Sequence, residues 1–145
     1  MKKLLIAAAL HTCLCANAAN WVAATASEWP LTDTTATIVE FDADSLKLRG
    51  GFRQAWVRYN HYPARWSLSG SGKLTGSATQ LTLFDCKNSE TATMQYLEHV
   101  ERFGRGMAGF MAEHQRAEAV ASMQVVVPGT FGETMLNYAC SQPLK

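Results

Sequence analysis

The chain has 145 residues, of which 48% are hydrophobic and 17% are charged, and its formal net charge is +1. This length is typical of one domain with its own hydrophobic core. A chain so close to neutral lacks the basic surface with which nucleic-acid-binding proteins neutralise phosphates, so its composition argues against that class of function.

Residues 1–18 have the pattern of a secretory signal peptide. A basic start is followed by an apolar run from Leu4 to about Cys15 and by Ala16-Asn17-Ala18, a small-x-small cleavage site. The run is shorter than the roughly 18 to 20 residues of a membrane span, and no later run reaches that length. We therefore predict that residues 19–145 form a single exported domain, periplasmic or cell-surface associated, without a transmembrane segment.

Cysteines and charges change when the signal is removed. Lys2 and Lys3 leave with it, so 13 basic residues become 11 against 12 acidic ones, a formal net charge of −1. Cys13 follows a leucine at the offset of a lipoprotein signal, which leaves a lipid anchor open. Cys86 and Cys140 remain as one pair and predict a disulfide in an exported protein. A metal or redox thiol pair is the alternative, but no CxxC motif or cysteine-histidine spacing supports it.

The first part of the mature chain predicts strands. Residues 20–25, the β-branched segment 37–42 and residues 52–59 have strand composition, and Gly50-Gly51 favours a hairpin turn before the third of these. Asp42, Asp44 and Ser45 have the spacing of calcium ligands. The glycine and distal glutamate of a calcium loop are missing, so an Asx-type turn is favoured.

Residues 61–66 read as a loop that contains His61, Tyr62, Arg65 and Trp66. Exposed aromatic and arginine side chains are typical of binding hot spots, so these four residues are a candidate partner-binding loop. The alternative is that the rings fold back onto the sheet. The Gly- and Ser-rich segment 67–77 that follows predicts a flexible connection.

The second half of the chain mixes strand and helix signals. Residues 78–87 read as a strand, 91–100 as either strand or helix, and 102–106 as a small basic turn with an exposed phenylalanine. A strand over 107–111 and a helix over 112–122 complete this part.

A buried strand, a turn and a closing helix are expected at the end of the chain. Val125-Val126-Val127 is the strand, Pro128-Gly129 is the turn, and Thr130 with Glu133 predicts a capping box. One face of the helix then carries the residues Met135, Leu136, Ala139 and Cys140. An irregular tail with a chance capping pattern is the alternative.

A series of motifs in this order resembles the surface-adhesin protein E family of Gram-negative bacteria: a tryptophan strand at the N-terminus, then Phe41-Asp42-Ala43-Asp44-Ser45-Leu46, Trp56-Val57-Arg58, Phe84-Asp85-Cys86-Lys87, Val127-Pro128-Gly129-Thr130 and Tyr138-Ala139-Cys140. The resemblance implies an α+β fold in which an antiparallel sheet of about six strands packs against the C-terminal helix. It also implies that the two cysteines are bridged. Characterised members attach to host matrix or plasma proteins, so the resemblance implies such partners here.

No motif of an enzyme is present, and we expect neither catalysis nor a cofactor. His61, His99 and His114 have no glycine-flanked serine, HExxH pattern or phosphate-binding loop beside them. His99 lies close in sequence to Glu98 and Glu101, which hints at a site, although a solvated charged face explains this more simply.

Two non-enzymatic functions remain. The first is a surface adhesin that binds extended host proteins through sheet edges and aromatic-arginine loops. The second is a periplasmic accessory domain that holds a small apolar ligand or a partner protein, with a lining of Met94, Met107, Met111 and Met123. Those methionines could equally be ordinary core. The sequence leaves open which partner is bound, on which side of the outer membrane, and in what oligomeric state.

Overall fold

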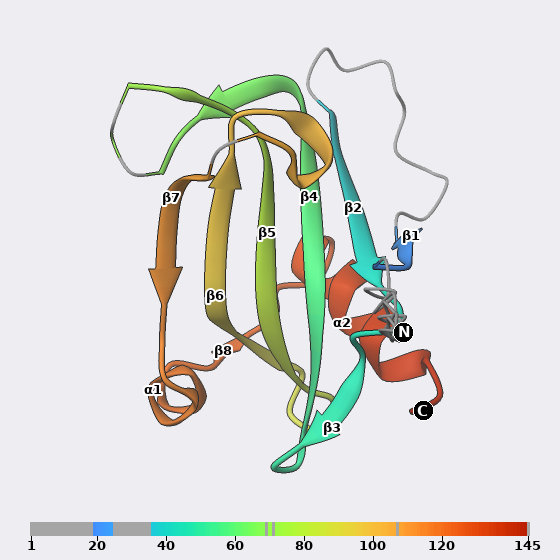
Figure 1. Ribbon diagram of the computed structural model, residues 1–145. Coiled ribbons are helices and arrows are strands. Elements are labelled where there is room, and N and C mark those ends of the chain that lie inside the picture. The colour runs from blue at the N-terminus through green and yellow to red at the C-terminus, as the bar shows by residue number, and fades with distance from the viewer. Residues whose placement is uncertain (1–18, 25–35, 69, 71, 107, 145) are drawn as a thin grey trace, which may run out of the picture.

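One antiparallel sheet organises the protein. The computed structural model describes residues 19–24, 36–68, 70, 72–106 and 108–144 (Figure 1). The predicted signal peptide and its cleavage site lie outside these residues. The main strand order is β1-β2-β4-β5-β6-β7, while β3 pairs with β4 and β8 pairs with β6. The bounds are β1 (Trp21–Ala23), β2 (Ala36–Asp42), β3 (Lys47–Arg49), β4 (Phe52–Trp66), β5 (Leu74–Asp85), β6 (Glu90–His99), β7 (Ala108–Glu113) and β8 (Gln124–Val125).

The described helices are short, and all three pack against the sheet. They are the 3₁₀ helix η1 (Arg102–Gly104), α1 (Arg116–Ala121) and α2 (Phe131–Ser141). In Figure 1, α2 lies behind the sheet and η1 in front of it. The sheet, the C-terminal helix and the disulfide confirm the predicted fold class. None of the helices in the described part of the chain has the length and hydrophobicity of a membrane span.

The main core lies between α2 and one face of the sheet. Alternate residues of β2, β4 and β5 point to this face because successive strand side chains project to opposite sides. Phe41 packs against Tyr138 of α2 with ring centroids 4.7 Å apart and against Phe84 at 5.8 Å. The buried residues of this cluster are Val39, Phe41, Leu46, Ala55, Val57, Phe84, Met135, Leu136 and Ala139. The helix face predicted from the sequence is therefore confirmed.

A smaller core on the opposite face lies beneath α1. Leu83, Ala92 and Ala119 are buried there, and Met94 and Met123 pack against them. These two methionines are thus part of a filled cluster rather than the lining of a cavity. Of the other two that the sequence singled out, Met111 is 65% exposed on the edge strand β7, and Met107 lies outside the described residues.

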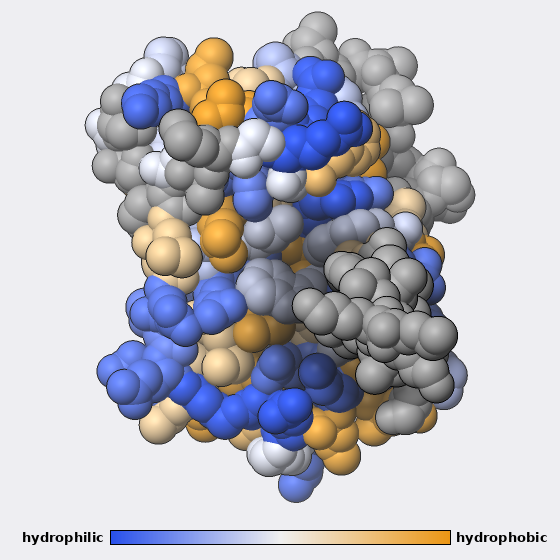
Figure 2. Space-filling view, viewed as in Figure 1, coloured by the Kyte–Doolittle hydropathy of each residue, from blue (hydrophilic) through white to orange (hydrophobic). Residues whose placement is uncertain are grey.

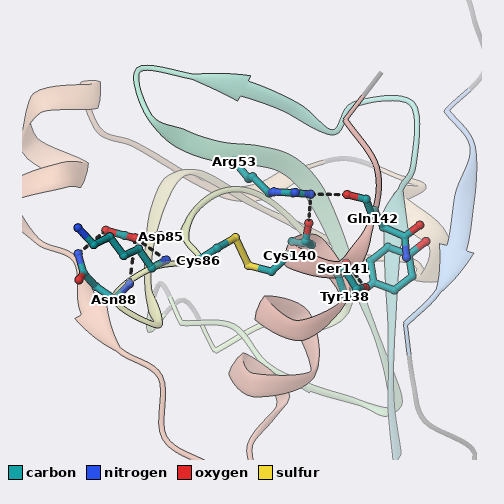
Figure 3. Close-up of a disulfide and its surroundings, with 10 residues drawn as sticks. Arg53, Asp85, Cys86, Asn88, Tyr138, Cys140, Ser141 and Gln142 are labelled. Carbon is teal, nitrogen blue, oxygen red and sulfur yellow. Dashed lines mark hydrogen bonds between the residues drawn. A yellow bond between two sulfur atoms is a disulfide. The ribbon is translucent and has the colours of Figure 1, made fainter.

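The predicted disulfide is present between Cys86 and Cys140, which are 54 residues apart in the sequence. It joins the turn after β5 to the last turn of α2 (Figure 3). Arg53 of β4 supports the same helix end, since its Nη1 donates hydrogen bonds to the carbonyl oxygens of Ala139 and Gln142. Carbonyls at a helix C-terminus lack partners within the helix, so these bonds satisfy two of them.

The prediction of a buried strand over residues 125–127 is wrong. β8 pairs with β6 through only two residues at the rim of the sheet, so Val125 and Val127 remain 68% and 63% exposed. The helix begins after Thr130 as expected, but the capping box differs. The Thr130 hydroxyl donates to the Val127 carbonyl, and Glu133 accepts the N–H of Gly129 rather than that of Thr130. The chain turns through Gly129 at φ +75°, which leaves the N–H of that residue near the carboxylate.

The segment 91–100, ambiguous in the sequence, lies almost entirely in strand β6, and the helix predicted over 112–122 is shorter because β7 continues to Glu113.

The prediction of a loop over residues 61–66 is also wrong. These residues continue β4 beyond an irregularity in its pairing with β5 between Asn60 and Arg65. The register resumes with Arg65 opposite Thr75 and Trp66 opposite Leu74. Pro63 is accommodated in this irregular part, where a strand tolerates a missing N–H.

Candidate binding site at the arginine loop

The four residues predicted as a partner-binding loop are separated by this strand geometry. His61 is only 8% exposed, and its Nδ1 lies 3.4 Å from the hydroxyl of Thr37. Burial and the positive charge of Arg65 lower the pKa of His61. Tyr62 lies beneath the guanidinium of Arg102, 4.0 Å from its ring centroid. Arg65 and Trp66 are exposed on the hairpin between β4 and β5, and their role in binding stays a prediction.

Residues 101–106, which include η1, form a segment that we call the arginine loop. Two fully buried side chains fix it from below. Asn60 accepts the Phe103 N–H at 2.7 Å and donates to the Glu40 carboxylate at 2.6 Å. Ser77 donates to the Glu101 carbonyl at 2.6 Å and accepts the Gly104 N–H at 3.0 Å. The loop backbone is therefore positioned by strands β4 and β5.

Arg58 completes this buried network. Its Nε donates to Glu40 at 2.8 Å, and its Nη1 donates to the Phe103 carbonyl at 3.1 Å. Its guanidinium carbon also lies 4.1 Å from the centroid of the Trp21 ring. Both members of the ion pair are largely buried, so the loop depends on a charge-assisted contact that solvent screens only weakly.

The backbone of the arginine loop is held in an unfavourable conformation. Phe103 has φ +62°, in the left-handed region of the Ramachandran plot. Adopting this conformation costs a residue other than glycine about 1 to 3 kcal/mol. Its ring is 41% exposed and therefore gains little from burial within the chain. The Phe103 N–H donates to Asn60 and the Phe103 carbonyl accepts from Arg58, and these two hydrogen bonds offset the strain.

The loop also rests directly on strand β5. A Cβ atom on Gly76 would lie 2.8 Å from the Val100 oxygen and the Glu101 carbonyl carbon, closer than such atoms approach. The Gly76 N–H donates to the Val100 carbonyl at 3.1 Å. Only glycine allows the two backbones to come this close.

An open hollow of about 380 Å³ lies beside the loop and is lined by Ala64, Gly76, Val100, Glu101, Arg102, Phe103 and Arg105. Strongly hydrophilic side chains gather over η1 in Figure 2. The guanidinium of Arg105 lies 5.7 Å from the Phe103 ring centroid. No carboxylate of the described residues lies within 4.0 Å of Arg102 or Arg105, so both cations can pair with a ligand.

Glu98 and His99, which lie close together in the sequence, are separated by the sheet. Glu98 and His99 are neighbours in β6 and project to opposite faces of the sheet. Glu98 is 1% exposed and accepts hydrogen bonds from Ser67 and Leu68, so the expectation that it lies on a solvated face is wrong. His99 Nε2 lies 3.1 Å from the Thr79 hydroxyl. Among the described residues, no group of His, Cys, Asp and Glu side chains is placed to hold a metal ion.

The family model described as Surface-adhesin protein E matches residues 25–141. The chain belongs to the surface-adhesin protein E family. The match includes the arginine loop, the disulfide and nearly all of the sheet, and it confirms the resemblance seen in the sequence motifs. No curated protein matches the sequence.

Solved structures of Haemophilus influenzae protein E share the fold of this member of the surface-adhesin protein E family. Crystal form II has a TM-score of 0.53 at 13% identity over 71% of this chain and 80% of that one. The selenomethionine form has a TM-score of 0.51 at 13% identity over 71% and 78% of the two chains. A further structure has the same TM-score and identity over 71% and 76%.

The sequence indicates only part of this candidate site. Residues 102–106 were recognised as a basic turn with an exposed aromatic residue, but Trp21 and Arg58 were not connected with it. Phe103 between an arginine and a glycine was the available local signal. The side chains that hold the loop are distant in the sequence: Asn60 lies 43 residues from Phe103, and Ser77 lies 27 residues from Gly104. No local sequence pattern connects them with the loop.

Proposed function

We propose that this protein is an exported, non-enzymatic surface adhesin that contacts host extracellular-matrix or plasma proteins through the arginine loop. The observation that carries the proposal is that buried hydrogen bonds hold residues 101–106 in place although Phe103 has a strained backbone. The loop held in this way presents Arg102, Phe103 and Arg105 at the surface. Membership of the surface-adhesin family and the signal-peptide pattern support location at the cell surface.

The loop has the properties of an interface hot spot. Arginine and aromatic side chains contribute most to protein interfaces, and the fixed backbone reduces the entropy lost on binding. Tyr62 beneath Arg102 and Phe103 near Arg105 hold both guanidinium groups against rings. The matching surface on a partner would be acidic with an exposed apolar residue, and salt would slow its association.

Location is tested by protease treatment of intact cells and of cells with a permeabilised outer membrane, read on reducing gels. Digestion on intact cells is the expected result. Protection until permeabilisation would contradict the adhesin proposal and favour the second function, a periplasmic accessory domain that binds a small apolar ligand or a partner protein.

Binding is tested by a screen of immobilised matrix and plasma proteins with the exported protein and its variants. Phe103→Asn removes the ring and keeps a residue that tolerates a positive φ. This variant and an Arg102→Gln/Arg105→Gln variant should bind at least about tenfold more weakly. Arg49→Gln is the matched control, because Arg49 is exposed on β3. Arg65→Gln and Trp66→Ser test the hairpin residues predicted from the sequence, and equal loss in Arg49→Gln would contradict the proposal.

A further inference from the structure

The hairpin between β4 and β5 carries an unusual set of exposed apolar side chains. Leu68 and Trp66 are 76% and 70% exposed, the highest values among the large hydrophobic residues that the structure describes, and Leu74 is 50% exposed. Trp66 lies opposite Leu74 in the strand register, and the Ser67 N–H donates to the Lys73 carbonyl at 2.9 Å. Trp66, Leu68 and Leu74 therefore belong to the same hairpin end.

Positive charge flanks these side chains. Arg65 and Lys73 are both exposed and lie next to Trp66 and Leu74 in the chain. Residues 65–74 contain these two basic residues and no aspartate or glutamate. The hairpin end is therefore cationic as well as apolar.

A buried carboxylate fixes the base of this hairpin. Glu98 of β6 accepts a hydrogen bond from the Ser67 hydroxyl and another from the Leu68 N–H at 2.9 Å. The Tyr96 hydroxyl donates to the same carboxylate at 3.3 Å. These bonds hold Ser67 and the Leu68 backbone against β6, and the Leu68 side chain is exposed from this position.

We propose that this hairpin end, with Trp66, Leu68 and Leu74 between Arg65 and Lys73, inserts into the headgroup region of an anionic lipid bilayer. Tryptophan and leucine beside lysine and arginine are the composition of interfacial membrane contacts, because the rings and aliphatic chains enter the headgroup layer while the cations meet lipid phosphates. The exposed cations Arg65 and Lys73 on either side of the apolar residues are complementary to the negative charge of such a bilayer. The contact is additional to the proposed binding by the arginine loop.

The experiment measures partition of the exported protein onto vesicles of phosphatidylcholine alone and of an equimolar phosphatidylcholine–phosphatidylglycerol mixture. Binding to the mixed vesicles is expected, with at least a roughly tenfold loss for Leu68→Ser. Arg65→Gln and Lys73→Gln should each weaken binding about fivefold at low salt. Val125→Ser is the control, because Val125 is 68% exposed at a distant rim position. All variants have the same N-terminal residues, so any contribution of those residues to vesicle binding is equal in every variant and cancels in the comparison.

Brominated lipids give a second readout. They quench tryptophan fluorescence when a ring enters the bilayer, so quenching should be present in the unaltered protein and strongly reduced in Trp66→Leu. The proposal is overturned if the mixed vesicles bind no protein, if Leu68→Ser binds as well as Val125→Ser, or if neutral vesicles bind equally well. The result is independent of the host-protein screen, because the arginine-loop variants should partition onto vesicles normally.

Discussion

Asn60 connects three segments of the chain through one amide side chain. It lies in β4, donates to Glu40 of β2 and accepts from Phe103 of the arginine loop. An amide suits this place because it offers a donor and an acceptor at once, whereas an aliphatic side chain offers neither.

Asn60→Leu should therefore destabilise the protein. The substitution leaves the Glu40 carboxylate with one bond fewer and removes the partner of the Phe103 N–H, at a cost of about 1 to 3 kcal/mol in the free energy of unfolding. Urea unfolding measures the change. Asn137→Leu, at an exposed position of α2, is the control and should shift the free energy by less than about 0.5 kcal/mol. Equal effects would mean that the Asn60 bonds contribute little.

Gly76→Ala tests the contact between the arginine loop and β5. The added methyl group would meet backbone atoms of residues 100–102 at 2.8 to 2.9 Å, and backbone cannot move aside as a flexible side chain can. We expect a loss of about 1 to 3 kcal/mol and weaker binding by the displaced loop. Gly109→Ala in β7, where an added Cβ meets nothing within 4 Å, should leave both quantities nearly unchanged.

Among the elements, α2 depends most on a covalent link. Closing a 54-residue separation with Cys86–Cys140 stabilises the fold by about 4 kcal/mol on the chain-entropy model. Cys86→Ser, or reduction of the unaltered protein, should lower the melting temperature by on the order of 10 °C. Calorimetry with and without reductant checks this, and the Cys86→Ser protein should not respond further to reductant. An unchanged melting temperature would show that packing against Phe41 and Phe84 alone holds the helix.

The elements differ in how well the sequence predicted them. Segment 37–42 and the turn at Gly50-Gly51 are specified locally, by β-branched residues and by glycines with positive φ, and both predictions are confirmed. Val125-Val126-Val127 is equally apolar but lies at a rim where two pairs of residues make up the ladder. Burial there depends on distant neighbours, which a local pattern does not contain. Residues 61–66 contain Pro63 and read as a loop, yet their pairing with β5 keeps them in a strand.

The whole molecule is held differently at its two ends. The helices α1 and α2 and the disulfide lie toward the end of the sheet with the β3–β4 turn, whereas the arginine loop, with η1, and the β4–β5 hairpin lie at the other end (Figure 1). Apolar packing stabilises the first end. Buried polar groups, among them Asn60, Ser77 and Glu98, stabilise the second.

Two histidines make the free energy of unfolding depend on pH. Burial lowers the pKa of both His61 and His99, with smaller contributions from Arg65 and Arg58 respectively. In the unfolded chain both groups titrate near 6.5, so the unfolded state binds more protons below that pH. Stability should be fully present above about pH 6.5 and should fall as the solution is made more acidic toward the folded-state pKa values.

Urea midpoints between pH 7.5 and 5 measure this dependence, in a window that spans about one unit above and more than one below the unfolded pKa. His61→Gln and His99→Gln should each flatten the decline, whereas His114→Gln, at an exposed position, should leave it unchanged. A profile that is the same in all three variants would assign the decline to other groups.

The position of the disulfide also determines what a cut in the arginine loop does. Arg102 and Arg105 are exposed and lie between Cys86 and Cys140 in the sequence. A trypsin-like protease that cleaves after either arginine therefore produces two polypeptides that stay covalently joined. Neither piece can diffuse away, and the nicked protein keeps strands β1 to β6 and strands β7 and β8 in one covalent molecule until a reductant breaks the disulfide.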